Sequence, residues 1–140
     1  MLQLDPYLTF DGNCAEAMRF YERTFGGKIE MMMTVGESPM RDQSPPGSEN
    51  RIMHARLALD GGRLIMASDA MVGQPYSGMH GISLTLMYPS AAEALSMFDT
   101  LAEGGTIHMP IEKTFWAEAF GMLTDRFGTP WLINGAMLHH

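Results

Sequence analysis

The chain has 140 residues, of which 46% are hydrophobic and 18% charged, and its formal net charge is −7. This composition is typical of an ordinary globular domain with enough chain for one core. It contains no apolar run near the roughly 18 residues that a membrane span needs. It also lacks the Lys and Arg stripes that nucleic-acid phosphates recruit. We therefore expect binding neither to membranes nor to nucleic acid.

The first five residues lack the basic and apolar regions of a signal peptide, which favours a cytoplasmic location. Cys14, alone in the chain, excludes an internal disulfide or a thiolate metal cluster within one chain. We interpret it as a small buried residue near a helix start. His139 and His140 are either native or the stub of a purification tag, and they are left out of any metal argument.

Residues 6–10 predict a strand with Leu8 and Phe10 on one face. A helix should follow, because Asn13 and Glu16 have capping-box spacing and Gly26-Gly27 supplies a left-handed stop. Its apolar stripe has the spacing i, i+3, i+4, i+7 and i+11, and consists of Cys14, Ala17, Met18, Tyr21 and Phe25.

Residues 28–35 should form the next strand, and residues 36–50 a long loop that is either a lid or disordered. Residues 51–59 and 63–69 then predict a hairpin around Asp60-Gly61-Gly62. Asp69 and Asp125 each follow a strand, and we expect both to form turns by accepting hydrogen bonds from nearby amides.

The second half repeats this order. Leu8-Thr9-Phe10 and Gly26-Gly27 recur as Leu84-Thr85-Leu86 and Gly104-Gly105, which lie 76 to 78 positions later. Ser90 and Glu93 have capping-box spacing at the start of the second helix. Residues 108–115, 120–125 and 129–134 should be the remaining strands, the last two joined by a turn at residues 125–128.

These elements predict an α+β fold of two tandem βαβββ modules that form a curled mixed sheet with the helices on the outer face. We assign residues 1–140 to a single domain, with module 1 at about 5–72, a linker at 73–79 and module 2 at about 80–134. Helices on one side leave the other side of the strands bare. We expect the two units to enclose a cleft there.

Several short motifs recur in a known order: Phe20-Tyr21, Phe25-Gly26-Gly27, Met53-His54-Ala55 with Leu64 to Asp69, Phe120 to Asp125, and Phe127-Gly128 through Trp131 to Asn134. Over residues 5–134 the chain resembles the PhnB-like branch of the vicinal oxygen chelate superfamily, which includes glyoxalase I, extradiol dioxygenases and bleomycin-resistance proteins. The resemblance implies paired βαβββ modules, a homodimer and sites built from two modules. Some relatives carry the name demethylubiquinone methyltransferase, an activity we do not expect without a glycine-rich strand-to-helix turn.

In metal-using members of the superfamily, four strand residues hold a divalent ion. Strand register carries those positions to Asp5, Met66, Gly81 and Leu132, and a shifted register brings in His80 or Asn134. Of the first four, Asp5 alone has a ligand for a hard cation, and a functional site needs three or four such ligands. We therefore expect neither a metal nor another cofactor.

Alternation along the hairpin predicts that Met53, Ala55, Leu57 and Leu59 pack on the helix, while Ile52, His54, Arg56 and Ala58 point the other way. Facing strands should place polar and apolar side chains on that second side. The predicted ligand-binding residues are Tyr7, Thr9, His54, Arg56, Met66, Ser68, Ser83, Thr85, Trp116 and Leu132.

His54 is the catalytic candidate because an imidazole can act as acid or base near neutral pH. Its alternative is a structural histidine hydrogen-bonded to a neighbouring strand or to Tyr7. Arg56 either clamps an anionic ligand or pairs with a carboxylate. Trp116 either stacks on a ligand or packs at a dimer rim, whereas Trp131 should be core. We interpret the fifteen methionines as core residues rather than as an adaptable binding surface.

The function we expect is therefore that of a homodimeric, metal-independent protein that binds a small molecule of unidentified structure. Whether it catalyses a reaction stays open. One alternative is a metal-dependent lyase, isomerase or dioxygenase of the same superfamily. The other is a metal-free acid-base enzyme that uses His54 and Arg56.

Overall fold

The computed structural model describes residues 1–138, which form two compact units, residues 1–78 and the residues from Met79 onward. We call them module 1 and module 2 and describe each by itself. Residues 73–78 belong to module 1, where the Tyr76 hydroxyl donates a 2.7 Å hydrogen bond to the carbonyl of Thr9. His139 and His140 lie outside the described residues.

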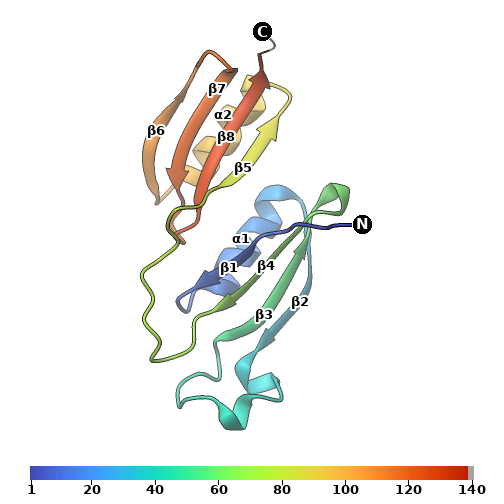
Figure 1. The fold of residues 1–140 in the computed structure, drawn as a ribbon, viewed down its shortest axis with the longest axis vertical. Coiled ribbons are helices and arrows are strands. Elements are labelled where there is room, and N and C mark those ends of the chain that lie inside the picture. The colour runs from blue at the N-terminus through green and yellow to red at the C-terminus, as the bar shows by residue number, and fades with distance from the viewer. Residues whose placement is uncertain (139–140) are drawn as a thin grey trace. The chain divides into compact units, whose positions relative to one another are not determined.

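Each module has the order strand, helix and three strands that the sequence predicts (Figure 1). Module 1 consists of β1 (Tyr7–Phe10), α1 (Cys14–Phe25), β2 (Lys28–Thr34), β3 (Ile52–Ala58) and β4 (Leu64–Asp69). Module 2 consists of β5 (Leu84–Tyr88), α2 (Ala91–Ala102), β6 (Thr106–Glu112), β7 (Ala117–Thr124) and β8 (Pro130–Met137). The α+β class and the tandem modules are therefore confirmed.

The two sheets are mixed and have the same topology. Their strand orders are β1-β4-β3-β2 and β5-β8-β7-β6, with one parallel pair in each, β1/β4 and β5/β8. Each helix covers one face of its own sheet (Figure 1). The buried core lies between helix and sheet: Leu8, Phe10, Cys14, Met18, Tyr21, Leu57 and Ile65 in module 1, and Phe98, Leu101, Leu123, Trp131 and Ile133 in module 2.

The repeated Gly-Gly pair has related roles in the two modules. Gly26 and Gly104 both have φ +74°, which glycine adopts without steric cost. Gly26 is the left-handed C-cap of α1, whereas the C-cap of α2 is Glu103, in an extended conformation, and Gly104 lies in the turn that follows. Gly27 and Gly105 instead lie where a Cβ atom would collide with the carbonyl oxygens of Ala58 and Thr124, respectively. The second glycine of each pair is therefore required for the same steric reason in both modules.

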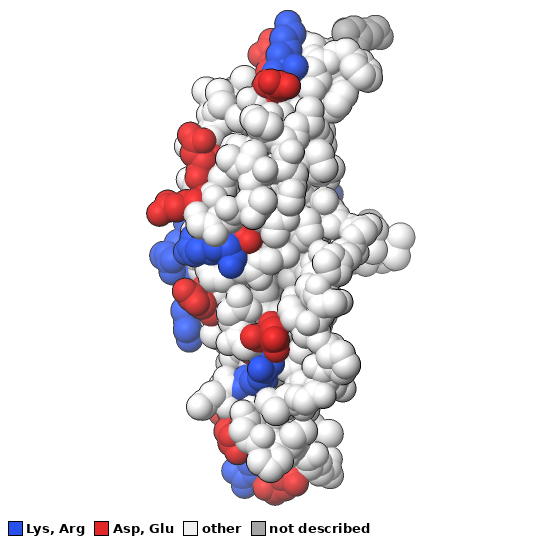
Figure 2. Space-filling view, turned by 90° about the vertical axis from the view of Figure 1, so that its left-hand side faces the viewer, with Lys and Arg blue, Asp and Glu red and all other residues white. Residues whose placement is uncertain are grey.

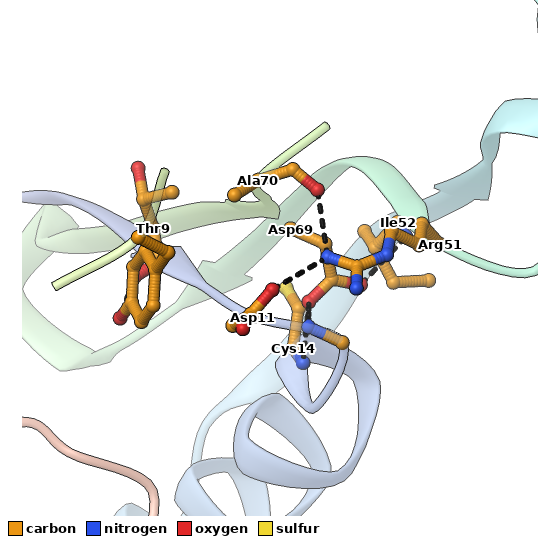
Figure 3. Close-up of polar contacts among 9 residues, drawn as sticks. Thr9, Asp11, Cys14, Arg51, Ile52, Asp69 and Ala70 are labelled. Carbon is orange, nitrogen blue, oxygen red and sulfur yellow. Dashed lines mark hydrogen bonds and ion pairs between the residues drawn. The ribbon is translucent and has the colours of Figure 1, made fainter. Parts of the chain in front are cut away.

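The predicted side-chain cap is wrong for α1, whereas Ser90 and Glu93 interact at the start of α2 as predicted. Asn13 makes no side-chain capping bond, so the predicted capping box at Asn13 and Glu16 is wrong. Asp69 Oδ1 accepts the backbone N–H groups of Gly12 (2.8 Å) and Cys14 (3.0 Å), and Asp69 Oδ2 accepts that of Ile52 (2.8 Å; Figure 3). Asp69 therefore ties α1 to β3 and does not form the predicted local turn.

The N-terminus of α2 is capped by its own residues. Ser90 Oγ accepts a 3.2 Å bond from the backbone N–H of Glu93 and donates a 2.9 Å bond to the Glu93 carboxylate. Gly135, on β8, lies where a Cβ atom would collide with Ser90 and Ala94. Gly135 is the residue of module 2 that corresponds to Asp69, and a capping side chain like that of Asp69 has no room at this position.

Residues 36–50 are not structureless. They include most of a 3₁₀ turn at Val35–Glu37 and all of another at Arg41–Gln43. A capping box between Thr34 and Glu37 fixes the first turn, and the hydrogen bonds that Thr34 donates to the Glu37 carboxylate keep the pKa of that carboxyl below its ordinary value. A lid role for this segment stays a prediction. Neither α1 nor α2 has the length and apolarity required to cross a membrane.

Candidate functional site

The helix-free face of each sheet carries the predicted site residues, and it can be identified from the packing. Leu8, Ala55, Leu57 and Ala67 are buried in the core of module 1, so alternation places their strand neighbours on the opposite face. We call this surface the module 1 face: Tyr7, Thr9, Met31, Met33, His54, Arg56, Met66 and Ser68.

Tyr7 and His54 meet on the module 1 face across the intervening strand β4. The Tyr7 hydroxyl lies 3.2 Å from His54 Nδ1, and the two rings stack with centroids 5.7 Å apart and planes inclined by 25°. The predicted contact between His54 and Tyr7 is therefore confirmed, whereas the catalytic role of His54 stays a prediction. When the hydroxyl donates to Nδ1, the neutral imidazole carries its proton on Nε2.

Arg56 carries a positive charge on this face. Its Nε donates a 3.0 Å hydrogen bond to the Glu30 carboxylate, and both side chains are about half exposed (46% and 47%). The predicted pairing of Arg56 with a carboxylate is thus confirmed. Met66 lies between Tyr7 and Arg56 in register, and Ser68 lies beside Thr9. These side chains give the module 1 face both ionisable and thioether groups.

Two predicted members of this region differ in position. Ile52 is buried at 4% exposure rather than open, because the β2/β3 pairing shifts register between Met33 and Thr34. Ser83 precedes β5, which begins at Leu84, and it is exposed. Thr85 lies on β5, in register with Leu132 of β8.

The module 2 face is defined in the same way. A Cβ atom on Gly121 would collide with Phe98 of α2, so the helix side of β7 carries residue 121 and its alternate neighbours. The opposite side is the module 2 face: Thr85, Met87, Met109, Glu112, Glu118, Phe120, Met122, Leu132 and Asn134.

An aromatic cluster covers one end of the module 2 face. Trp116, just before β7, contacts the ring of Phe120 edge-on at 5.0 Å, and Phe115 contacts Trp116 in the same manner at 4.7 Å. The Trp116 indole N–H donates a 3.3 Å hydrogen bond to Asn134 Oδ1. Trp116 is half-buried and the Asn134 residue is 6% exposed.

The two faces have diverged at equivalent positions. The hairpin pair nearest the turn is Ala58 with Leu64 in module 1 and Thr124 with Pro130 in module 2. When the two modules are aligned on these pairs, His54 corresponds to Phe120 and Arg56 to Met122. The imidazole and guanidinium of one face are thus replaced by a phenyl ring and a thioether on the other. Phe120 and Asn134 were not among the predicted ligand-binding residues, although alternation along residues 120–124 places Phe120 beside Met122.

The positions implied for a metal do not fit one. Met66 and Leu132 offer no oxygen or nitrogen ligand, and Asp5 is occupied by Gln3 Nε2 (2.6 Å) and the Leu64 backbone N–H (3.1 Å). The bond from Gln3, and then that from Leu64, keep the pKa of Asp5 below its ordinary value. In residues 1–138 there is no group of three or more His, Cys, Asp or Glu side chains placed to hold an ion.

Several other candidates are structural. Asp125 accepts from the backbone N–H groups of Phe127 (2.9 Å) and Thr129 (3.0 Å), which confirms the predicted turn, and also from Trp131 Nε1 (2.9 Å). Trp131 is 1% exposed and therefore core, as predicted. His108 lies on the edge strand β6, where Nε2 is 2.7 Å from Thr124 Oγ1.

The interpretation of the methionines as core residues is wrong for most of them. Among the described residues, Met18 is the one methionine in the buried core. Met31 and Met87 are exposed on the module 1 and module 2 faces, respectively. Short alternating strands place every second residue outside the core, so a methionine-rich strand cannot bury all of its side chains. The thioethers therefore supply a polarisable surface on both sheets.

Charged side chains do not gather by sign on the surface that Figure 2 shows. Acidic and basic side chains lie beside one another there, and this view shows no continuous basic patch among the described residues. Phosphate backbones are bound through such patches. The view therefore supplies no nucleic-acid surface.

The chain was compared with protein families and with curated proteins. The model of the family described as 3-demethylubiquinone-9 3-methyltransferase matches residues 3–134. Protein YjdN of Escherichia coli K12 is 38% identical over 141 aligned positions, which cover 95% of each chain.

Solved structures agree with this result. Protein PA1353 from Pseudomonas aeruginosa is 47% identical with a TM-score of 0.88, covering 96% of this chain and 98% of its own. The PhnB protein from Bacillus cereus, described as a putative 3-demethylubiquinone-9 3-methyltransferase, is 28% identical with a TM-score of 0.80, covering 96% and 100%. A glyoxylase/bleomycin resistance protein/dioxygenase domain from Frankia, 14% identical with a TM-score of 0.69 and covering 100% and 95%, shares the fold.

Proposed function

Because the chain belongs to the family described as 3-demethylubiquinone-9 3-methyltransferase, the PhnB-like branch of the vicinal oxygen chelate superfamily, we propose that it is a cytoplasmic, homodimeric small-molecule binding protein that works without a catalytic metal. The observation that carries the proposal is the hydrogen-bonded Tyr7–His54 pair on the helix-free face of module 1.

The surroundings of this pair suit a small organic ligand. His54 Nδ1 is engaged by Tyr7, and among the described residues Nε2 has no hydrogen-bond partner. Nε2 is therefore available to a ligand acceptor. Met66 and Met33 supply apolar contact nearby, and Thr9 and Ser68 supply hydroxyls. Convergent polar groups on a mostly uncharged surface are typical of sites that orient an organic ligand.

Arg56 favours a ligand with an acceptor or anionic group. A half-exposed ion pair such as Arg56–Glu30 contributes about 0–1 kcal/mol, so it exchanges readily. The guanidinium has four further N–H donors besides the one on Nε. A carboxylate or phenolate ligand can therefore contact Arg56 without displacing Glu30.

Methyl transfer is not part of the proposal. The two strand-to-helix connections of the described chain, residues 11–13 and 89–90, contain one glycine between them, Gly12. Gly12 donates its N–H to Asp69. These connections do not form the glycine-rich turn that presents several amides to a nucleoside cofactor.

The test is a nuclear magnetic resonance screen of protein labelled with ¹⁵N at histidine. A fragment set of benzoates, phenols and benzamides is added, and the imidazole signals of His54 and His108 are followed. We expect some members to shift His54 and to leave His108, which is bonded to Thr124 on an edge strand, unchanged. His54→Gln should abolish the binding, and Tyr7→Phe should weaken it several-fold.

Two results would contradict the proposal. One is a fragment set that leaves His54 unmoved, or that moves His54 and His108 alike. The other is about one tightly held Ni, Zn, Mn or Fe per chain in undenatured protein, measured by elemental analysis. That result would favour the metal-dependent lyase, isomerase or dioxygenase.

A further inference from the structure

We propose that Met33 is a site of reversible oxidation, at which a peroxide converts the thioether into a sulfoxide that bonds to His54 and thereby weakens ligand binding. The inference rests on the proposed function in one respect, that the ligand binds to His54. The oxidation itself needs no ligand. It concerns two side chains on neighbouring strands, and their contact can be followed in the free protein.

Met33 and His54 lie directly opposite each other on β2 and β3. Side chains of such a cross-strand pair lie on the same face of the sheet, with Cβ atoms roughly 4.5–5.5 Å apart. Both residues are partly exposed, so a dissolved peroxide can reach the thioether. A methionine side chain is unbranched and flexible, and at this separation its end reaches the imidazole.

The Tyr7 hydroxyl decides which ring nitrogen of His54 faces Met33. The hydroxyl lies 3.2 Å from Nδ1, and Tyr7 belongs to β1. Because the strand order is β1-β4-β3-β2, Tyr7 and Met33 lie on opposite sides of His54. In an imidazole ring, Nε2 lies on the side away from Nδ1. With Nδ1 turned toward Tyr7, Nε2 is therefore turned toward β2, the strand of Met33.

Oxidation changes what Met33 offers to this nitrogen. In the reaction with hydrogen peroxide the S–O bond forms as the O–O bond breaks, the sulfur is oxidised, and the peroxide is reduced to water. A thioether sulfur is a weak acceptor, whereas the sulfoxide is polar and its oxygen accepts well. The neutral imidazole of His54 donates its Nε2–H to this oxygen. A ligand acceptor then has to compete for that N–H.

The three consecutive methionines of β2 provide internal comparisons. Met31 is 39% exposed and lies opposite Arg56, whereas Met32 lies opposite the buried Ala55 and points to the helix side. Met31 should therefore be oxidised at least as fast as Met33, but its sulfoxide forms beside a guanidinium. Of the three, Met33 alone is paired with the imidazole. Sulfoxides are returned to thioethers by methionine sulfoxide reductases, so the change can be reversed.

The experiment uses the full chain labelled with ¹⁵N at histidine and treated with dilute hydrogen peroxide in the absence of any ligand. Peptide mass spectrometry identifies the methionines that have gained an oxygen atom. Met18 is 0% exposed and should stay reduced, which shows that the chain remains folded. As the sulfoxide of Met33 accumulates, the Nε2–H signal of His54 should shift while the signals of His108 stay in place. A methionine sulfoxide reductase with a dithiol should restore the first spectrum.

Met33→Leu and Met31→Leu are the matched variants, because leucine fills a similar volume and cannot be oxidised. In peroxide the Met33→Leu protein should keep its His54 signal, whereas Met31→Leu should respond as the wild type does. Oxidation of the wild type should also lower the affinity for a binding fragment of the benzoate, phenol and benzamide set about tenfold, the value of one hydrogen bond. That loss should be absent from Met33→Leu.

Three results would overturn the proposal. In the first, Met33 becomes oxidised and the His54 signal does not move. In the second, Met33 stays reduced after Met31 is fully oxidised. In the third, Met33→Leu responds to peroxide as the wild type does.

The outcome is separable from that of the proposed function. A His54 shift on oxidation, in a protein that binds none of the fragments, would uphold the oxidation site and count against the proposed ligand. Fragments that bind the oxidised and the reduced protein equally well would overturn this inference and leave the proposed function standing.

Discussion

The backbone N–H of Cys14, the first residue of α1, donates a 3.0 Å hydrogen bond to the carboxylate of Asp69 at the end of β4, 55 positions further along the chain. The same carboxylate holds Gly12 and Ile52 (Figure 3). One carboxylate thus accepts hydrogen bonds from backbone N–H groups at the start of α1 and at the start of β3. Nearby, Arg51 Nη1 donates to the Asp11 carboxylate (2.9 Å) and the Ala70 carbonyl (2.8 Å).

Asp69→Ala should therefore destabilise module 1 strongly. It leaves three backbone amides without acceptors, and each buried unpaired amide costs about 1–3 kcal/mol. We expect the free energy of unfolding to fall by about 3 kcal/mol or more. The measurement is urea denaturation followed by circular dichroism at the helix band.

Asp11→Ala is the control for this prediction. Asp11 also receives a charge-assisted bond, from Arg51, but its side chain is 54% exposed. An exposed pair contributes about 0–1 kcal/mol. If both substitutions cost the same, the role assigned to the buried Asp69 carboxylate is wrong.

The adjacent glycines after α1 should respond differently to the same substitution. Asparagine tolerates the left-handed conformation, so Gly26→Asn should cost well under about 1 kcal/mol. Any side chain at Gly27 meets the Ala58 carbonyl, so Gly27→Asn should cost about 1–3 kcal/mol or prevent folding. Urea midpoints of the two variants test this. Equal midpoints would show that the second glycine is not required for steric reasons.

Alkaline pH should destabilise the protein through Cys14. Burial, and secondarily the charge of Asp69, raises the pKa of the Cys14 thiol to about 12. The unfolded thiol ionises near its usual pKa of about 8.5, whereas the folded thiol stays neutral, so the unfolded state gains stability as pH rises above that value. The stabilising contribution of the neutral Cys14 thiol is therefore fully present below about pH 8.5 and is lost progressively as pH rises toward 12.

We expect the loss due to Cys14 to approach about 1.4 kcal/mol per pH unit between pH 9 and 10 in the wild type, and the slope of Cys14→Ala to be smaller by that amount. Urea titrations at pH 8, 9 and 10 compare the two slopes. A parallel check is the reaction of Cys14 with a thiol reagent at pH 8, which should be slow until urea unfolds the chain. Identical slopes for the two proteins would refute this assignment.

Much of the architecture could be predicted because local patterns and the duplication agree. The stripe through Cys14, Ala17 and Met18 predicts α1, and its recurrence through Ala94, Leu95 and Phe98 predicts α2, with strands placed between them. The Tyr7–His54 contact was also foreseen as an alternative, because alternation places both on one face of the sheet.

The parts that could not be predicted depend on contacts between residues far apart in the chain. The Asn13–Glu16 spacing fits a capping box, but Asp69 supplies the acceptor, and it lies 57 and 55 positions from Gly12 and Cys14, the amides it binds at the start of α1. Glu30 as the partner of Arg56, and Asn134 as the partner of Trp116, follow from strand register and rotamers. Neither leaves a local sequence signal.

The two helix starts test directly whether a cap is local or distant. A polar residue suited to capping precedes each helix, but Ser90 caps α2 whereas Asn13 does not cap α1. Ser90→Ala removes the hydroxyl that accepts from the Glu93 N–H, and should cost about 1 kcal/mol in module 2. Asn13→Ala removes a side chain that makes no capping bond, and should change stability by less than about 0.5 kcal/mol. Tryptophan fluorescence during urea unfolding reports on module 2, and circular dichroism reports on both modules. A cost for Asn13→Ala equal to that for Ser90→Ala would mean that Asp69 does not replace the local cap of α1.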